Sequence, residues 1–327
     1  MSSDAAGMPP ERLVRCGAGS EGGPVGGRLA LSVDDRIHAV SLRIDRLTRR
    51  LVSELPDHVV DLLEIAAYIY AADAAIRRGG PSDRQLGVDW RRRLSFEIPV
   101  RVPELWNGAE VRELLAETLG TLSEDEYAFS FVPHPAPHAR ERYFRFREGE
   151  GFEANEVLLF SGGLDSLAGA LEELVGRGNR AVLVSHHSST KLQKVQADLI
   201  EDLRKQAGAN RLLHVPVTMR MRTGSNRETT HRSRSFFFAA MGIAAASMFG
   251  RDRLHFYENG VVSINLPPSG QAVGARARRA RRIRRYWTVS HGCSRPYSVA
   301  MSRSTTLFSG RPRRKSSRPF EISGRKA

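Results

Sequence analysis

The sequence predicts an α/β protein in which a parallel sheet carries helices on both faces, preceded by a smaller α+β region. From residue 156 onward, short apolar runs typical of buried strands alternate with helix-like stretches, which is the order that parallel sheets require. Before residue 150 the sequence does not alternate in this way. The predicted division is a flexible leader (1–27), an N-terminal α+β region (28–150), an α/β domain (151–275) and a basic tail (276–327).

The leader is rich in glycine, serine and proline and has no apolar signal core, so we do not expect secretion. In the α+β region, apolar residues near a 3.6-residue period predict a helix over 57–78, which Gly79-Gly80 ends. Residues 96–102 alternate like a strand, in which Pro99 favours a sheet edge. A second helix is predicted over 108–122, and short strands over 127–132 and 142–147.

The α/β domain is predicted to have strands over 157–160, 181–184, 212–217 and 254–257, with more extended chain over 261–266. Helices are predicted over 167–174, 191–206 and 235–249, and the phenylalanines at 236–238 are expected in the core. Ligands of such sheets bind beyond the C-terminal ends of the strands. We therefore expect the residues that follow the strands to converge on one crevice.

Composition limits the class of protein. A length of 327 residues with 41% hydrophobic residues suits one large or two ordinary globular domains. No run approaches 18 apolar residues, so we expect no membrane span. The two cysteines, Cys16 and Cys293, form no C-x-x-C pair, so we expect no zinc site and a reducing, cytoplasmic location.

The stretch most informative about function is Ser161-Gly162-Gly163-Leu164-Asp165-Ser166, between a predicted strand and a helix. Glycines allow an anion to approach the backbone, and the helix start offers unpaired N–H groups and the positive end of a dipole. The carboxylate in this loop is consistent with Mg²⁺ binding or with fixing the loop. The spacing matches neither G-x-x-x-x-G-K-[ST] nor G-x-G-x-x-G. A chance glycine turn is the alternative.

Four further residues are candidates for the same crevice. His186, next to His187, follows a strand and is placed to hold an adenine base or a nucleophile, unless the pair belongs to an ordinary loop. Arg234 precedes an apolar helix and suits an α-phosphate, the alternative being a solvated basic turn. Glu258 and Asn259 offer acceptors and donors to a purine-like substrate, unless they only close a turn.

On these residues the chain resembles the QueC-like (7-cyano-7-deazaguanine synthase-like) branch of the PP-loop ATP pyrophosphatases, and within it the branch of the Qat anti-phage defence systems. The resemblance covers about residues 156–275, and residues 28–150 are loosely similar to the extra N-terminal region of the defence branch. It is carried by S-G-G-L-D-S, by Arg234-Ser235, and by the segment E-N-G-V-V-S-I-N-L-P that begins at Glu258.

The resemblance implies the PP-loop fold (adenine nucleotide alpha-hydrolase-like) and an ATP-dependent ligase that uses Mg²⁺. A carboxylate of the 7-carboxy-7-deazaguanine type attacks the α-phosphate of ATP and releases pyrophosphate, after which an amine displaces AMP. In the synthases this chemistry serves queuosine biosynthesis. In defence relatives the acceptor is a deazaguanine-type small molecule or a modified protein, and companion defence proteins are expected.

The resemblance also distributes roles among the residues. Residues 161–166 and His186 bind ATP, and Asp165 binds Mg²⁺. Asp165 and Arg234 are the expected catalytic residues, and Glu258 and Asn259 the substrate-binding ones. The four zinc-binding cysteines of the synthases have no counterpart here, which disfavours nitrile synthesis and favours the defence branch.

The net charge of +14 lies in the tail, where residues 276–327 hold 16 lysines and arginines and one acid, Glu321. One interpretation is a basic arm that binds nucleic acid. The other is a frameshift near residues 276–279. GC-rich codons for residues 279–285, read two bases later, encode R-T-T-H-P-P, similar to the continuation of the resembling family, and the tail would then be largely disordered. A tRNA-modifying PP-loop enzyme is a further alternative, weakened because the sequence has no catalytic cysteine pair.

Overall fold

The computed structural model describes residues 11–17, 28–33, 36–44, 55–78, 91–135, 152–221, 228, 232–257 and 298–300. The N-terminal elements are β1 (Glu11–Cys16), β2 (Arg28–Val33), β3 (Arg36–Ile44), α2 (Asp57–Ala75), β4 (Arg93–Val100), α3 (Pro103–Trp106), α4 (Ala109–Ser123) and β5 (Glu126–Pro133). They are followed by β6 (Glu156–Leu159), α5 (Leu164–Leu171), a π-helical turn (Glu172–Gly176), β7 (Ala181–His186), α6 (Thr190–Ala207), a 3-10 turn (Ala209–Arg211), β8 (Leu212–Met221), α7 (Arg234–Met248), β9 (Arg253–His255) and β10 (Ser298–Ala300).

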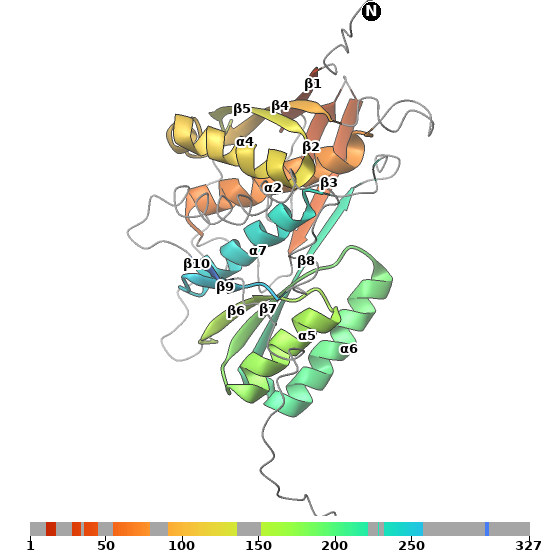
Figure 1. Ribbon diagram of the computed structural model, residues 1–327, viewed down its shortest axis with the longest axis vertical. Helices are drawn as coiled ribbons and strands as arrows, with labels where there is room; N and C mark the ends of the chain where they lie inside the picture. Colours follow the sequence, from red (N-terminus) through yellow and green to blue (C-terminus); the bar gives the residue numbers. More distant parts are fainter. Residues whose placement is uncertain are drawn as a thin grey trace, which may run out of the picture.

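The strands described form one mixed sheet in the order β10-β9-β6-β7-β8-β3-β2-β1-β4-β5 (Figure 1). From β10 to β8 all neighbouring strands run parallel, as the alternation of strands and helices predicts. In the N-terminal part β4 is parallel to both of its neighbours, whereas β2 and β3 are antiparallel to theirs. The protein is therefore an α/β protein, with parallel and antiparallel strands in the same sheet.

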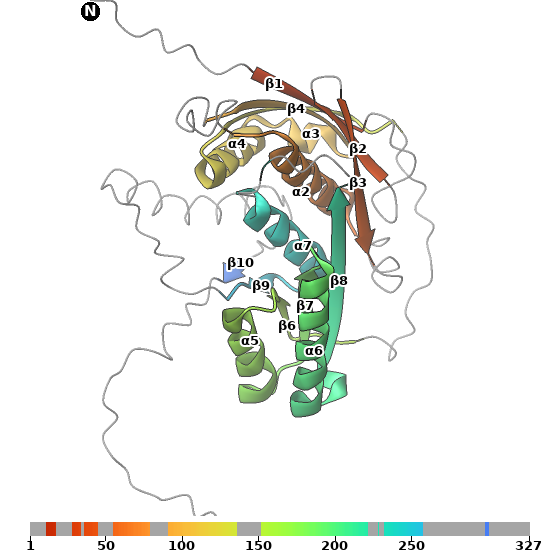
Figure 2. The ribbon, with the colours of Figure 1, turned by 90° about the vertical axis from the view of Figure 1, so that its right-hand side faces the viewer.

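Strand β8 joins the two predicted regions. Its first half pairs with β7 and its second half with β3, so that Val217 is paired with His186 on one side and Ile44 on the other. Figure 2 shows this long strand reaching from the level of α6 to the N-terminal strands. The boundary predicted between residues 150 and 151 is therefore not a break in the sheet.

Helices cover both faces of the parallel strands because apolar side chains point alternately to the two sides. Leu158 and Leu183 pack in a cluster with residues of α5 and α6. Their neighbours Val157 and Val182 belong to a second cluster, which includes Phe237 of α7. The prediction of helices on both faces is confirmed.

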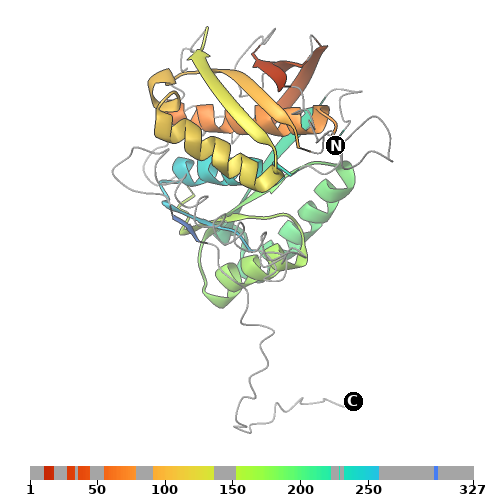
Figure 3. The ribbon, with the colours of Figure 1, turned by 45° about the horizontal axis from the view of Figure 1, so that its top comes forward.

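Helix α2 is buried on almost every side, because it packs between the N-terminal strands and α7 (Figure 3). The core around it extends from β1 and β4, through α2 and α7, to β6 and β7. The helix also buries three carboxylates, on Asp61, Glu64 and Asp73, which must find partners in this apolar surrounding. Asp61 accepts hydrogen bonds from the backbone of Arg101 and from the indole of Trp106.

Two sequence predictions for the N-terminal part need correction. Residues 11–16 of the expected leader form β1, which pairs with β2 and β4. Strand β4, expected at an edge because of Pro99, is an interior strand between β1 and β5. Proline is tolerated because the pairing with β1 ends at Glu97, so no ladder N–H is needed on that side at position 99. The proline ring packs against Gly17 instead, where a Cβ would come within 2.8 Å of the Pro99 Cγ.

Part of the predicted tail is described by the structure, and several other predicted segments are not. Ser298–Ala300, within the tail expected to be disordered, pairs with β9 as a parallel strand. The strand predicted over 142–147, the extended chain over 261–266 and the proposed frameshift near 276–279 lie outside the described residues. No helix in the described ranges is long and apolar enough to cross a membrane.

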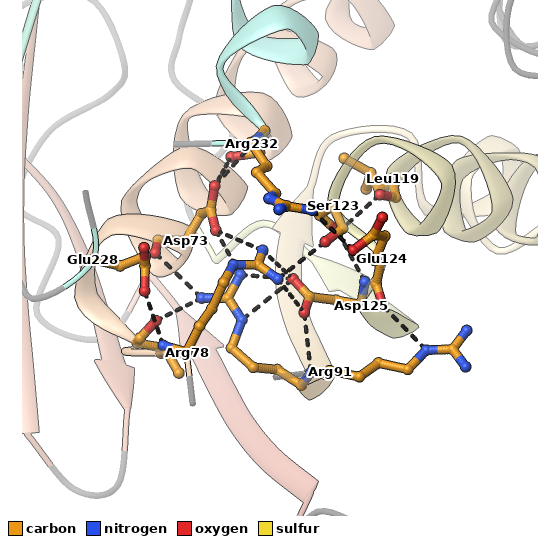
Figure 4. Close-up of polar contacts among 12 residues, drawn as sticks. Asp73, Arg78, Arg91, Leu119, Ser123, Glu124, Asp125, Glu228 and Arg232 are labelled. Carbon is orange, nitrogen blue, oxygen red and sulfur yellow. Dashed lines mark hydrogen bonds and ion pairs between the residues drawn. The ribbon is translucent and has the colours of Figure 1, made fainter. Parts of the chain in front are cut away.

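The side chains of Asp73, Arg78, Arg92 and Asp125 are buried together near the end of α2 and the starts of β4, β5 and α7 (Figure 4). Arg78 and Arg92 each contact both Asp73 and Asp125, and the contacts to Asp125 Oδ2 measure 2.6 Å. Burial by itself raises the pKa of Asp73, but Arg92 and hydrogen bonds from Ser233 outweigh burial and hold that pKa below its ordinary value. Equal numbers of the two charges make this buried charge cluster tolerable in the core.

We expect Asp125→Asn to lower the free energy of unfolding by about 3–5 kcal/mol, because it leaves two buried guanidinium groups without their main counter-charge. The control is Asp202→Asn, which removes an exposed carboxylate 3.4 Å from Lys205 and is expected to change stability by less than about 0.5 kcal/mol. Urea unfolding followed by circular dichroism measures both variants. Equal losses in the two would contradict a special role of the buried charge cluster.

Candidate functional site

A cavity of about 480 Å³ opens where β6 and β7 end and where α5 and α7 begin. This volume lies within the range of small-molecule binding sites. Of the residues predicted from the sequence, the cavity is lined by Ser161, Gly163, Asp165, Ser166, His186 and Arg234. The convergence expected from the ends of parallel strands is therefore present for these residues.

The glycine loop, residues 161–166, is closed on itself by its two hydroxyl groups. Ser161 Oγ lies 3.1 Å from Ser166 Oγ and accepts a hydrogen bond from the Gly163 N–H at 3.3 Å. Ser166 in turn donates to the Gly163 carbonyl at 2.9 Å. Helix α5 begins directly within this turn, at Leu164, whose side chain is 80% exposed. The loop thus presents backbone and hydroxyl groups of a helix start to the cavity.

Gln196 of α6 supports this loop and was missed by the sequence analysis. Its side chain is fully buried, and its Nε2 donates to the Ser161 carbonyl at 3.0 Å. It packs behind Gly162, which has a φ of 81° and has no room for a side chain: a Cβ there would lie 2.9 Å from Gln196 Cγ. A polar residue on the buried face of an otherwise amphipathic helix is the sequence signal that points to it.

Two arginines enter the cavity from the start of α7. The guanidinium of Arg234 lies over the ring of Phe238, 4.8 Å from its centroid, so this phenylalanine, which packs against the core, also forms part of the cavity wall. Within the described part of the chain, Arg234 has no carboxylate partner and its Nε is buried without a hydrogen bond. Arg232 also lines the cavity and pairs with Glu124, with 3.0 Å between Nη1 and Oε2.

The start of α7 is held by Asp73, another residue missed from the sequence. Its Oδ2 accepts hydrogen bonds from the backbone N–H and the hydroxyl of Ser233, at 3.0 Å and 2.8 Å. A carboxylate at this position satisfies a free N–H group and complements the helix dipole. Because Asp73 belongs to the buried charge cluster, the N-terminal region determines the position of the start of α7 and of the two arginines that line the cavity there. No local pattern connects positions 160 residues apart.

His186 lies at the inner wall of the cavity and is only 3% exposed. The rings of Tyr70, Phe237 and Phe238 contact it edge-on, at centroid distances of 5.4 to 6.1 Å. Burial, followed by the charge of Arg234, lowers its pKa to about 4, although the nearby backbone of Met219 acts in the opposite direction. The histidine is therefore neutral at pH 7, and its ring nitrogens are buried without a well-formed hydrogen bond to another described residue.

Asp165 supplies the one carboxylate among the described residues that line the cavity. It forms no hydrogen bond or ion pair with another described residue. In the described ranges, no group of three or more histidine, cysteine, aspartate or glutamate side chains is arranged to hold a metal ion. Mg²⁺ commonly binds through one or two carboxylates together with phosphate oxygens, so Asp165 fits such a shared site.

Tyr257 forms the wall next to the glycine loop. Its ring lies against Gly169 so closely that a Cβ there would meet the ring at 2.2 Å, and its hydroxyl donates to the buried Glu173 at 2.8 Å. The predicted substrate-binding residues Glu258 and Asn259 follow directly in sequence but lie outside the described residues.

Comparisons with protein-family models, with curated proteins and with solved structures give no significant match.

We expect the stability of the protein to fall as the pH is lowered from 6.5 to 4, in part because of His186. The unfolded chain takes up a proton near the ordinary histidine pKa of 6.5, whereas the folded protein does so only near 4. Above pH 6.5 His186 is neutral in both states and does not change the free energy of unfolding. Below pH 6.5 its protonation in the unfolded chain lowers that free energy by at most about 1.4 kcal/mol per pH unit.

The measurement compares wild type with His186→Phe by urea unfolding between pH 4 and pH 7.5. Phenylalanine cannot take up the proton, so the wild type should lose stability relative to the variant as the pH falls. Parallel pH profiles for the two proteins would show that His186 is not held neutral.

Proposed function

We propose that this protein is a PP-loop nucleotide-binding enzyme that uses ATP and Mg²⁺ to adenylate a carboxylate and releases pyrophosphate. The observation that carries the proposal is the meeting of the S-G-G-L-D-S loop with Arg234 and His186 in one cavity. The loop and the arginine are the two parts of the resembling motifs that the described residues include. The cytoplasmic location expected from the cysteine content belongs to the same proposal.

The polyphosphate end of ATP fits the side of the cavity formed by the glycine loop. The start of α5 contributes N–H groups and the positive end of its dipole, while the hydroxyls of Ser161 and Ser166 are bonded within the loop and fix its shape. Arg234 has no carboxylate partner among the described residues, so it is available to the α-phosphate, where negative charge develops during attack. Mg²⁺, when bound between Asp165 and phosphate oxygens, would neutralise the adjacent negative charges.

The transfer itself requires one bond to form and one to break. An oxygen of the substrate carboxylate attacks the α-phosphorus, and the bond between that phosphorus and the oxygen bridging to the β-phosphate breaks, so that pyrophosphate leaves with the bond electrons. An amine then attacks the acyl carbon, the bond between that carbon and the phosphate oxygen breaks so that AMP leaves, and the amine nitrogen releases a proton to solvent. His186, neutral at pH 7, can accept a hydrogen bond from a donor on the nucleotide or the nucleophile, or donate one.

The proposed substrate class is a 7-carboxy-7-deazaguanine-type carboxylate, or a protein acceptor in an anti-phage defence system with companion proteins. This part rests on the resemblance of the segment that begins at Glu258. That substrate would meet the wall formed by Phe256 and Tyr257, which precede the segment and line the cavity.

Incubation with ATP, Mg²⁺ and 7-carboxy-7-deazaguanine should yield AMP, detected by mass spectrometry. Arg234→Gln should weaken ATP binding about tenfold to a hundredfold, because it removes a charge-assisted hydrogen bond to phosphate. Arg251→Gln is the matched control: this exposed arginine follows the opposite end of α7 and should bind ATP as the wild type does.

The same reaction is run on a second form of the protein, in which the reading frame after residue 275 is shifted. AMP from both forms supports adenylation and shows that the present tail is dispensable. AMP from the shifted form alone would show that residues needed for the reaction are encoded after residue 275 in the other reading frame. If neither form binds ATP, the PP-loop proposal is wrong.

The basic tail supports a second candidate function, which is nucleic-acid binding. Seven arginines lie within residues 276–285, and no acid accompanies them. If they bind phosphates, replacing all seven by glutamine should flatten the dependence of log affinity on log salt by about 0.9 for each phosphate that is no longer neutralised. Fluorescence anisotropy with a labelled duplex measures this slope, and Arg251→Gln again serves as control. An unchanged slope would exclude the tail as the binding element.

A further inference from the structure

Gln196 occupies a position that the packing of α6 reserves for an apolar side chain. The buried residues of this helix are Gln196, Ile200 and Leu203, which form one stripe, and the latter two pack in the apolar cluster under the sheet. The glutamine is fully buried, yet its Oε1 has no hydrogen-bond partner in the described part of the chain. A half-satisfied buried amide costs free energy that leucine would not.

The one hydrogen bond that this amide makes goes to the glycine loop. Gln196 Nε2 donates to the carbonyl of Ser161 at 3.0 Å, and the aliphatic part of the same side chain packs against Gly162. In a trans peptide the carbonyl and the following N–H point in opposite directions. Holding the Ser161 carbonyl on α6 therefore directs the Gly162 N–H away from that helix.

The loop sequence alone does not determine this peptide orientation. Gly162 has a φ of 81°, and glycine adopts positive and negative φ about equally well. If the peptide between residues 161 and 162 turned over, φ at Gly162 would become negative, and the Ser161 carbonyl would take the place of the N–H. A carbonyl oxygen on that side would repel an anion instead of binding it.

We propose that Gln196 is a positioning residue for an anion site: by holding the Ser161 carbonyl it keeps the glycine loop shaped for a phosphate-containing ligand such as pyrophosphate. This inference deepens the proposed function and rests on it for the identity of the anion. Gln196 itself does not contact the cavity, since its bond is made to the rear of the loop.

The test is Gln196→Leu, which removes the amide but keeps an apolar side chain of similar size on the stripe. The affinity for inorganic pyrophosphate with Mg²⁺, measured by calorimetry, should fall at least about tenfold, while the melting temperature stays the same or rises. Gln193→Leu is the matched control, because this glutamine lies three residues earlier on α6 and is exposed. Pyrophosphate affinity within about twofold of wild type in Gln196→Leu would overturn the proposal.

Hydrogen exchange without any ligand separates this proposal from the proposed function. In Gln196→Leu the amide of Gly163, which donates to Ser161 Oγ, should exchange at least about tenfold faster, whereas the amides of residues 199–206 on the same helix should not change. If exchange in the loop is faster in the variant but the wild type does not bind pyrophosphate, the identity of the ligand is wrong. Gln196 would then still be shown to hold the loop in shape. Unchanged exchange in the loop would remove the positioning role. If leucine disturbs the packing, Gln196→Met provides the same test with an unbranched side chain.

Discussion

The buried charge cluster of Asp73, Arg78, Arg92 and Asp125 is the constraint on which the site depends. Charges can be buried in a core only when each one meets its counter-charge, so the segments that carry them must come together at one point. These segments are α2 with the residues that directly follow it, the residue before β4 and the residue before β5. The second oxygen of Asp73 then holds Ser233 at the start of α7. The position of the cavity arginines is thus set by the N-terminal region, although the glycine loop lies in the other part of the chain.

Three polar side chains in or directly behind the cavity lack full hydrogen-bond or charge partners among the described residues. His186 is buried among aromatic rings with neither nitrogen in a well-formed hydrogen bond, Arg234 has no counter-charge, and Gln196 behind the loop uses only half of its amide, all among the described residues. Each of these arrangements lowers stability relative to an apolar or fully paired alternative. Unpartnered polar groups at a cavity are typical of a site that binds a polar ligand, and the described residues also include such atoms elsewhere, for example Arg78 Nε and Thr118 Oγ1.

Much of the parallel part of the fold could be predicted because its signals are local. The apolar runs at 157–160 and 181–184 and the amphipathic pattern at 191–206 each specify an element, and the order of the elements specifies a parallel sheet. The predictions of a flexible leader over residues 11–16 and of a sheet edge at Pro99 were wrong, because the pairing of strands depends on residues far apart in sequence. A proline excludes an interior position only where the neighbouring strand would accept a hydrogen bond from its backbone N–H. The pairing of β1 with β4 ends at Glu97, so no such bond is required at position 99. Glu258 and Asn259 remain predictions, as does the origin of the tail.

The sequence by itself determined the order of strands and helices from residue 156 onward and the glycine loop with its serines and aspartate, because these depend on residues close together along the chain. It also placed His186 and Arg234 next to strand and helix ends. Only the tertiary structure decided that one sheet joins the two regions through β8, that Asp73 holds the start of α7, and that Gln196 supports the loop from behind. These contacts join residues far apart in sequence. They form because a buried charge or amide is stable only with a hydrogen-bond or charge partner, and the fold supplies that partner from a distant part of the chain.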